Sequence, residues 1–332
     1  MNLKNQKDFF SGLLFMAAGL SFAWSAPRYT VGTAADMGPG YVSLLLGAVL
    51  TLLGGVVVFK ALVFETEDGG RIGAWAWQTL AWVVLTNLAL GWVLDRWAPF
   101  AGRDVGAAFT KLKLLPLLTG MLGALGPVEA VALMVLCLMV AVVLASGTWL
   151  KAVAMGVLGL LLGLVGTSMA SDAVRFALDL PELAGGIGFV ALAIGVLGYG
   201  DRIRTLASHR RMRQTAGARR VGRWFFPALV FLYAVGVGAI RGSTFDLWLL
   251  TGCALVGHVF RQLDMQPAPL LLGFVLGPLM EDKLRSALQF ADGDWSVFVS
   301  RPLSAGLLLG AVGLLLLAPI VRSWRPTTWK RR

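Results

Sequence analysis

The chain has 332 residues, of which 57% are hydrophobic and 14% are charged, and its mean hydropathy is +0.76. An ordinary soluble domain is about 45–50% apolar and about 25% charged. Long apolar runs recur along the whole length, so the composition excludes a soluble globular protein and indicates an all-α, polytopic integral membrane protein.

The net charge of +11 is concentrated in two segments. Residues 202–223 hold eight arginines and no acid, and residues 322–332 hold five basic residues and no acid. Basic clusters beside apolar spans are typical of the cytoplasmic side of a membrane. This distribution favours membrane orientation over nucleic-acid binding, and no nucleic-acid partner is expected.

Windows of apolar residues bounded by charges and prolines predict about ten spans. In chain order they lie near residues 9–26, 41–63, 73–94, 128–146, 150–168, 185–200, 225–240, 245–260, 268–280 and 303–321. The first run follows Lys4 and Lys7 and is long for a signal peptide, so it is interpreted as an uncleaved span.

An even number of crossings in each half places both basic segments and both termini in the cytoplasm, as the positive-inside rule requires. Residues 95–113 depart from this rule, because four basic residues there would lie outside against two acids. An additional crossing or a re-entrant piece near 114–127 is the alternative to ten spans. The expected location is a bacterial inner membrane.

Catalytic and metal-binding patterns are scarce. The two histidines are His209, in the basic segment, and His258, within a predicted span. Cys137 and Cys253 both lie in apolar runs and match no disulfide or metal pattern. No Ser-His-Asp pattern, P-loop or zinc motif is present. The sequence therefore predicts a protein that is not an enzyme, with no metal and no cofactor.

Small and polar residues inside the spans carry more information. Gly156, Gly159, Gly163 and Gly166 are spaced to share one helix face, which predicts close helix packing. Glu129 opens a span after Gly-Pro, and polar groups at membrane depth tend to line aqueous paths. Other acidic and basic groups beside the spans are Arg175, Asp179, Asp246, Glu281 and Asp282.

The run from Pro269 to Met280 is too short to cross a bilayer, since 12 helical residues span about 18 Å and a bilayer core is about 30 Å thick. It begins behind prolines and contains Gly277-Pro278. One interpretation is a broken or re-entrant helix, which many secondary transporters use to build substrate sites. The other is a kinked, ordinary span that continues through residues 281–290.

The first third resembles a known family. Residues 32–55 contain Gly32-Thr33 followed by Met37, Gly38, Pro39, Gly40 and Tyr41. This pattern is similar to the first loop and second span of the small membrane subunit of tripartite tricarboxylate transporters. The resemblance covers about residues 8–95.

From about residue 114 the chain resembles the second half of the large, channel-forming subunit of the same systems. The Gly-Pro-x-Glu pattern ends at Glu129, and an Arg-Phe pair begins at Arg175. A third pattern runs from Ala268 through Pro269, Gly273 and Gly277 to Glu281, with Arg301-Pro302 after it. The substrate-path candidates implied are Pro269, Gly273, Gly277, Glu281, Arg175 and Glu129.

Two glycine-rich segments of the large subunit's first half, Pro-Gly-Leu-Gly-Pro and Tyr-Gly-Gly-Ser, are not found here. The predicted organisation is a small-subunit-like domain at 1–95, a junction at 96–113 and the C-terminal half of a permease at 114–332. The resemblance implies a secondary transporter for tricarboxylates or related carboxylates, driven by a Na⁺ or H⁺ gradient.

The partners implied by the resemblance are a periplasmic solute-binding protein, other membrane subunits and a small carboxylate, with a homo-oligomer as a further possibility. Backbone groups of residues 268–280 would then bind the substrate carboxylates, and Arg175 would supply countercharge. The alternative from another class is a non-transporting remnant, or an assembly partner of a complete carrier. The lack of those first-half segments motivates this alternative.

Overall fold

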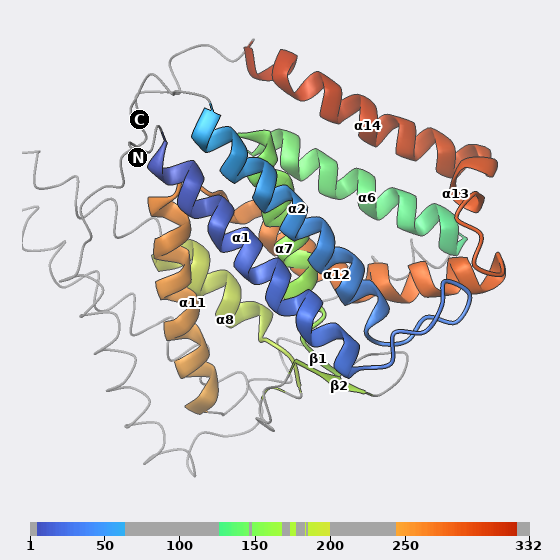
Figure 1. Ribbon diagram of the computed structural model, residues 1–332, viewed down its shortest axis with the longest axis horizontal. Helices are drawn as coiled ribbons and strands as arrows, with labels where there is room; N and C mark the ends of the chain where they lie inside the picture. Colours follow the sequence, from blue (N-terminus) through green and yellow to red (C-terminus); the bar gives the residue numbers. More distant parts are fainter. Residues whose placement is uncertain are drawn as a thin grey trace, which may run out of the picture. The chain divides into compact units, whose positions relative to one another are not determined.

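A computed structural model describes residues 5–63, 126–145, 148–167, 173–176, 183, 185–199 and 244–323 of the chain (Figure 1). Within these ranges nearly every element is a helix. Three described helical stretches are long and apolar enough to cross a membrane: Gln6–Arg28, Tyr41–Val63 and Pro127–Leu144. The protein is therefore a mostly helical protein with candidate membrane spans, and the figure of about ten spans stays a prediction.

The chain forms two compact units. The first contains residues 1–71, 119–186 and 263–332, and the second contains residues 72–118 and 187–262. The predicted boundary at 96–113 lies outside the described residues, and so do the predicted spans 73–94 and 225–240. The basic segment 202–223, residues 324–332 of the second basic segment and the ambiguous run at 114–125 lie outside them as well.

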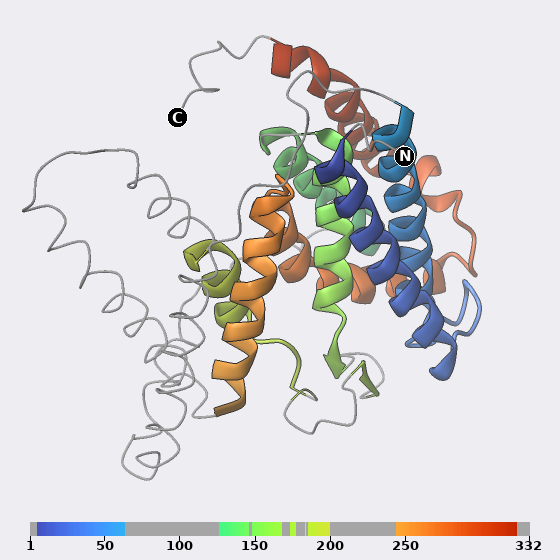
Figure 2. The ribbon, with the colours of Figure 1, turned by 60° about the vertical axis from the view of Figure 1, so that its left-hand side comes forward.

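The first unit begins with a helical hairpin. Helix α1 (Gln6–Ser25) continues into the short helix η1 (Ala26–Arg28), and a loop then leads into α2 (Tyr41–Val63). The two long helices run side by side in Figures 1 and 2. Asn5 caps α1 by accepting a hydrogen bond from the Asp8 amide at 3.2 Å, which satisfies one of the free amides that every helix start leaves.

Glycines bring two further helices together. Helix α7 (Trp149–Gly163) packs on α12 (Pro267–Phe290). A Cβ at Gly277 would lie 2.6 Å from the Leu160 carbonyl oxygen, and one at Gly273 would lie 3.0 Å from the Leu160 amide nitrogen. Gly159 and Gly163 make similarly close contacts with the backbone of α12. The predicted packing face of α7 is confirmed for these glycines, because small residues let helix backbones approach closely.

The prediction of a short helix that ends at Met280 is wrong. Helix α12 has 24 residues, and Pro278 lies inside it. A proline removes one backbone hydrogen bond from a helix, yet neighbouring helices can compensate for the break. Here a Cβ at Gly163 would lie 3.2 Å from Pro278 Cδ, so α7 packs directly against the proline. The structure supports one continuous helix at residues 267–290. This helix is not among the described stretches that are long and apolar enough to cross a membrane.

Helices α6 (Pro127–Leu144) and α14 (Pro302–Ser323) complete the first unit together with the short helix α13 (Val297–Ser300). Helix α6 packs on both α12 and α14. In the turn that follows α12, Ser296 donates hydrogen bonds to Asp294 from its amide at 2.9 Å and its hydroxyl at 2.6 Å. These bonds lower the pKa of Asp294.

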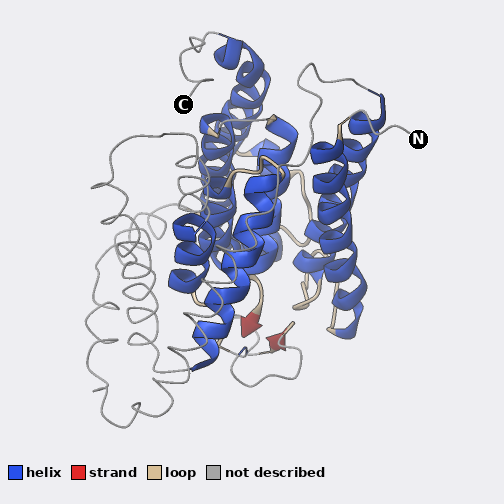
Figure 3. Cartoon of the chain, turned by 90° about the vertical axis from the view of Figure 1, so that its left-hand side faces the viewer, coloured by secondary structure: helices blue, strands red, loops and turns tan. Residues whose placement is uncertain are grey.

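Two very short strands depart from the all-α prediction. Strand β1 (Gly166–Thr167) pairs antiparallel with β2 (Val174–Arg175), and Gly166 is opposite Arg175. Figure 3 shows them in red among the blue helices. Gly166 is therefore not on the helix face of α7, because the helix ends at Gly163 and Gly166 has a φ of 113°. The predicted span 150–168 is correspondingly too long at its C-terminal end.

The second unit is described through α8 (Phe189–Ala193), the π-helical segment η4 (Ile194–Tyr199) and α11 (Thr244–Gln262). Glycines again allow close packing. A Cβ at Gly195 would lie 2.5 Å from the Cβ of Cys253, and one at Gly257 would lie 2.8 Å from the Cα of Val196. His258 lies on α11 and is buried.

Candidate functional site

A buried ion pair joins Arg175 on β2 to Glu281 on α12. Arg175 Nη1 donates to Glu281 Oε1 at 2.7 Å, and Arg175 Nη2 lies 2.6 Å from Oε2. The two residues are only 2% and 4% exposed. This is the bidentate geometry in which a guanidinium and a carboxylate bind most strongly. Both residues are among the site candidates predicted from the sequence.

The same guanidinium reaches the small-subunit-like loop. Arg175 Nη1 also donates to the Pro39 carbonyl at 2.5 Å. Pro39 lies within the predicted Met37-Gly38-Pro39-Gly40 motif, so three motifs from distant parts of the sequence meet at one side chain. A buried arginine needs such acceptors, because a buried charge without partners is costly.

The loop that presents Pro39 is fixed by its own backbone. The Gly38 amide donates to the Val31 carbonyl at 2.8 Å, and the Gly40 amide donates to the Thr30 carbonyl at 3.1 Å. Gly40 also comes close to the end of α1, since a Cβ there would lie 2.5 Å from the Ala26 carbonyl oxygen. These two glycines therefore serve close backbone approach, which explains why the motif requires them.

The residue after Arg175 fixes the orientation of β2. Phe176 has a φ of 54°, in the left-handed region that a bulky residue rarely adopts. Its amide donates to the Tyr29 hydroxyl at 2.9 Å. Its ring makes edge contacts with Phe22 and Tyr29, with centroids 4.9 and 5.3 Å apart. The α1–α2 hairpin thus holds the backbone on which Arg175 stands.

The turn after α12 touches the other part of the loop. Gly293 has a φ of 85°, and a Cβ there would lie 2.9 Å from the Ala35 amide nitrogen. The loop is therefore in contact with β2 through Pro39 and with the turn after α12 through Ala35.

The electrostatics of the cluster are those of a neutral pair. The charge of Arg175 is balanced by Glu281, and Arg175 Nε is buried without a hydrogen-bond partner. The sequence predicts that Arg175 supplies countercharge to a substrate; in the structure, the carboxylate it binds is that of Glu281. A direct substrate contact by either residue stays a prediction.

Glu129 pairs with an arginine of another motif. It lies in the first turn of α6, and Arg301, just before α14, donates to its Oε1 at 3.1 Å. The Arg301 side chain is 48% exposed and the Glu129 side chain 12%. Glu129 Oε2 is buried and has no hydrogen-bond partner. This ion pair joins the Gly-Pro-x-Glu motif to the Arg-Pro motif. It is separate from the pair between Arg175 and Glu281.

The other candidates lie along α12. Pro269 is buried in its first turn, and Gly273 and Gly277 face α7. The structure uses these two glycines for helix packing. Their part in a substrate path stays a prediction. Among the described residues, no group of three or more His, Cys, Asp and Glu side chains is placed to hold a metal ion.

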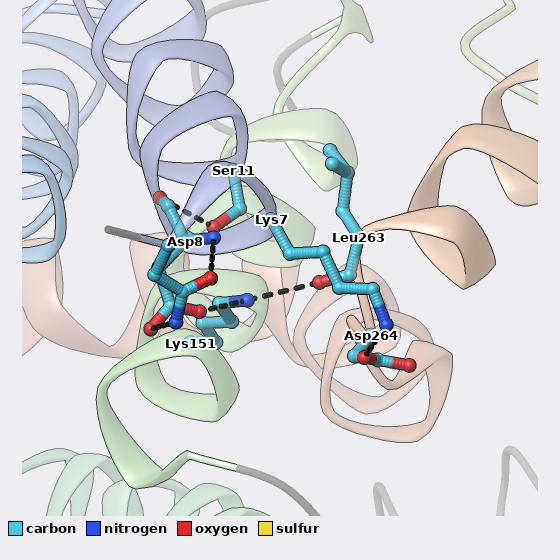
Figure 4. A network of polar contacts seen from close by, with 7 residues as sticks. Lys7, Asp8, Ser11, Lys151, Leu263 and Asp264 are labelled. Carbon is cyan, nitrogen blue, oxygen red and sulfur yellow. Dashed lines mark hydrogen bonds and ion pairs between the residues drawn. The ribbon is translucent and has the colours of Figure 1, made fainter. Parts of the chain in front are cut away.

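A second buried ion pair was not predicted from the sequence (Figure 4). Lys151 on α7 lies 2.5 Å from Asp8 Oδ1 on α1 and donates to the Leu263 carbonyl at 2.9 Å. Beside it, Lys7 lies 2.6 Å from Asp264, but both side chains of that pair are more exposed. The available signal was a lysine inside an otherwise apolar run, since charges at membrane depth are rare and usually paired.

Comparison with known proteins supports the resemblance. Residues 97–224 match the profile of the Tripartite tricarboxylate transporter TctA family. The chain is 44% identical over 105 residues to the "Uncharacterized protein in TAR-II ttuC' 3'region" of Agrobacterium vitis. It is 43% identical over 107 residues to the "Uncharacterized 52.8 kDa protein in TAR-I ttuC' 3'region" of the same organism. It is also 29% identical over 87 residues to the 16.3 kDa protein of that TAR-I region.

These matches cover parts of each protein. The first two alignments each cover 31% of this chain, with 43% of the first relative and 21% of the second. The third covers 26% of this chain and 55% of the 16.3 kDa relative. No solved structure matches the chain.

The candidate membrane spans and the family match together indicate a multi-pass membrane protein. Residues 97–224 are the segment that is similar to the Tripartite tricarboxylate transporter TctA family. Arg175, Glu129 and Lys151 lie inside this segment. Pro39, Asp8 and Glu281, which bind two of them, lie outside it.

Proposed function

We propose that this chain is a membrane component of a binding-protein-dependent secondary transporter for tricarboxylates or related carboxylates. In this proposal an ion gradient, of Na⁺ or H⁺, drives uptake. A periplasmic solute-binding protein delivers the substrate, and other membrane subunits of the same transporter, or further copies of this chain, complete the translocation path.

The observation that carries the proposal is the convergence at Arg175. A residue of the segment that is similar to the TctA family binds the motif glutamate of α12 and the Pro39 carbonyl of the small-subunit-like loop. Motifs that resemble two different transporter subunits are therefore parts of one folded unit. This supports one membrane component that combines both kinds of sequence.

The relatives support the same combination. The chain is similar both to a 52.8 kDa protein and to a 16.3 kDa protein whose names place them in the same TAR-I region. The proposed location is the bacterial inner membrane with both termini in the cytoplasm, because the arginine-rich segments 202–223 and 322–332 favour that side.

Cells provide the first test. A bacterial host without its own citrate and C4-dicarboxylate uptake systems would express this chain with a cognate binding protein. We expect uptake of labelled carboxylate that stops when the ion gradient is collapsed. Uptake equal to that of cells with the binding protein alone, at confirmed membrane abundance, would contradict the proposal.

The second candidate function is that of a non-transporting assembly partner of a complete carrier. The observation that favours it is charge pairing: Arg175, Arg301 and Lys151 each already bind a carboxylate of this chain. It predicts that the chain alone moves nothing but co-purifies with a complete large subunit. Co-purification without uptake by the chain alone would select this candidate.

A further inference from the structure

The α1–α2 hairpin packs on itself through reciprocal glycine contacts. A Cβ at Gly12 would lie 2.8 Å from the Gly54 carbonyl oxygen, and a Cβ at Gly54 would lie 2.8 Å from the Gly12 carbonyl oxygen. Gly19 and Gly47 repeat this arrangement at 2.7 and 2.9 Å. Both pairs are seven residues apart on their helices, so backbone contacts join the hairpin along its length. These contacts need nothing from the rest of the chain.

Near the start of α1, the hairpin is held by one buried cation. Lys151 is 4% exposed, and its ammonium binds Asp8 of the hairpin and the Leu263 carbonyl in the turn before α12 (Figure 4). Without Asp8, this ammonium would keep a single described acceptor. Such a loss is severe for a buried charge.

At the loop end, the hairpin is held by a second buried cation. Arg175 binds the Pro39 carbonyl of the hairpin and the carboxylate of Glu281. The Phe176 amide adds a bond to the Tyr29 hydroxyl of the same loop. As at Lys151, the positive charge belongs to the surface that α7 and β2 form, and an acceptor belongs to the hairpin.

The two contacts are far apart along the hairpin. Asp8 is in the first turn of α1, and Pro39 lies beyond the end of that helix of 20 residues, which at 1.5 Å per residue is about 30 Å long. Two polar contacts so far apart fix both the position and the tilt of the hairpin. Between them the hairpin packs on α7, through α1 and α2 alike.

We propose that residues 5–63 form a docking module that the surface of α7 and β2 holds non-covalently, with Lys151 and Arg175 as its two anchors. The partner that this surface fits is a glycine-packed helical hairpin. It carries a carboxylate, that of Asp8, near its N-terminus and an acceptor carbonyl, that of Pro39, in its connecting loop. The peptide link that leaves α2 is not what retains it. The inference concerns assembly and holds whether or not the chain transports carboxylates.

The test keeps the full chain until after folding. A protease site is inserted between Val63 and Phe64, with an epitope at the N-terminus and an affinity tag at the C-terminus. The protein is purified from membranes in mild detergent and cut, and cleavage is verified on a denaturing gel. Capture on the C-terminal tag then measures the fraction of the N-terminal fragment retained.

Matched lysine variants separate docking from general stability. Lys151→Ala removes the buried anchor, whereas Lys7→Ala removes the neighbouring exposed pair. We expect the cut wild-type and Lys7→Ala proteins to retain the fragment. We expect Lys151→Ala to lower retention by about five-fold or more relative to Lys7→Ala, because a lost buried pair costs several times more than a lost exposed one.

Each variant is also run uncut by gel filtration, and Asp8→Asn replaces Lys151→Ala if the latter is not monodisperse. Release of the wild-type fragment after cutting overturns the proposal. Equal retention by the Lys7 variant and a monodisperse anchor variant overturns the role of Lys151 as an anchor.

Discussion

Removing the charge of Glu281 should destabilise the folded protein strongly, because it leaves the Arg175 guanidinium buried without its counterion. The substitution Glu281→Gln keeps the shape of the side chain and removes only the charge. Arg175 is 2% exposed and Glu281 is 4% exposed. Solvent therefore cannot replace the lost carboxylate.

The magnitude follows from the burial of the pair. Breaking a buried ion pair by removing one partner typically costs about 3–5 kcal/mol. Replacing both partners by apolar residues, as in Arg175→Met with Glu281→Leu, is often nearly neutral. Here the double variant also removes the donor of the Pro39 carbonyl, which costs about 1–3 kcal/mol if that carbonyl finds no other partner. The double variant should thus be more stable than the Glu281→Gln variant.

Thermal unfolding in detergent can be followed through the 12 tryptophans. At about 2–4 °C per kcal/mol for a domain of moderate size, Glu281→Gln should lower Tm by roughly 6 °C or more. The double variant, with an expected cost of about 1–3 kcal/mol, should recover about half of that loss. A cycle that adds the Arg175→Met and Glu281→Leu single variants measures the coupling between the two positions.

Two results would refute this reasoning. A Tm for Glu281→Gln within about 1 °C of wild type would mean that the buried pair does not stabilise the fold, against the cost expected for it. A double variant whose loss equals the sum of its two singles would mean that the side chains act independently, since coupled neighbours are not additive.

Three smaller predictions test other contacts by the same unfolding assay. Gly277→Ala should lower Tm, since overpacking typically costs about 1–3 kcal/mol; Gly55→Ala, where no atom lies within 4 Å of the added Cβ, should not, and equal effects would argue against the glycine interface. Tyr29→Phe should cost about 1 kcal/mol by removing the acceptor of the Phe176 amide, and an unchanged Tm would contradict that role. Arg301→Ala should cost about 1 kcal/mol or less, because its side chain is 48% exposed; a Tm loss as large as that of Glu281→Gln would contradict this ranking.

The described spans were well predicted where prolines, glycines or charged residues clearly bound a long apolar run. The run that starts after Pro39-Gly40 predicts residues 41–63, and α2 has these bounds. The prediction failed at α12, because a proline inside an apolar run marks either a break or a packed kink. Which of the two occurs depends on a neighbouring helix that sequence spacing does not reveal.

The candidate site was predicted in its members but not in its pairing. Glu129, Arg175 and Glu281 were each singled out, but no pattern in the sequence indicates that the arginine and glutamate motifs bind one another. Arg175 and Glu281 are 106 residues apart in the sequence, and Glu129 and Arg301 are 172 residues apart. Strands β1 and β2 have two residues each, too few to show the alternation that predicts a strand.

The anchor Lys151 was missed for a related reason. It is buried and binds Asp8, which lies in a distant part of the sequence, near the start of α1. A single lysine near the start of a predicted span is equally consistent with an exposed residue at a membrane surface. Burial, which decides between the two, is a property of the packed helices.

The most direct test of the central claim is uptake by proteoliposomes that contain this chain as their sole membrane protein. Labelled citrate and C4-dicarboxylates would be supplied with a cognate binding protein under imposed Na⁺ or H⁺ gradients. The account predicts accumulation that requires both the binding protein and one of the gradients. No accumulation by folded, correctly oriented protein would contradict a transport role for this chain alone.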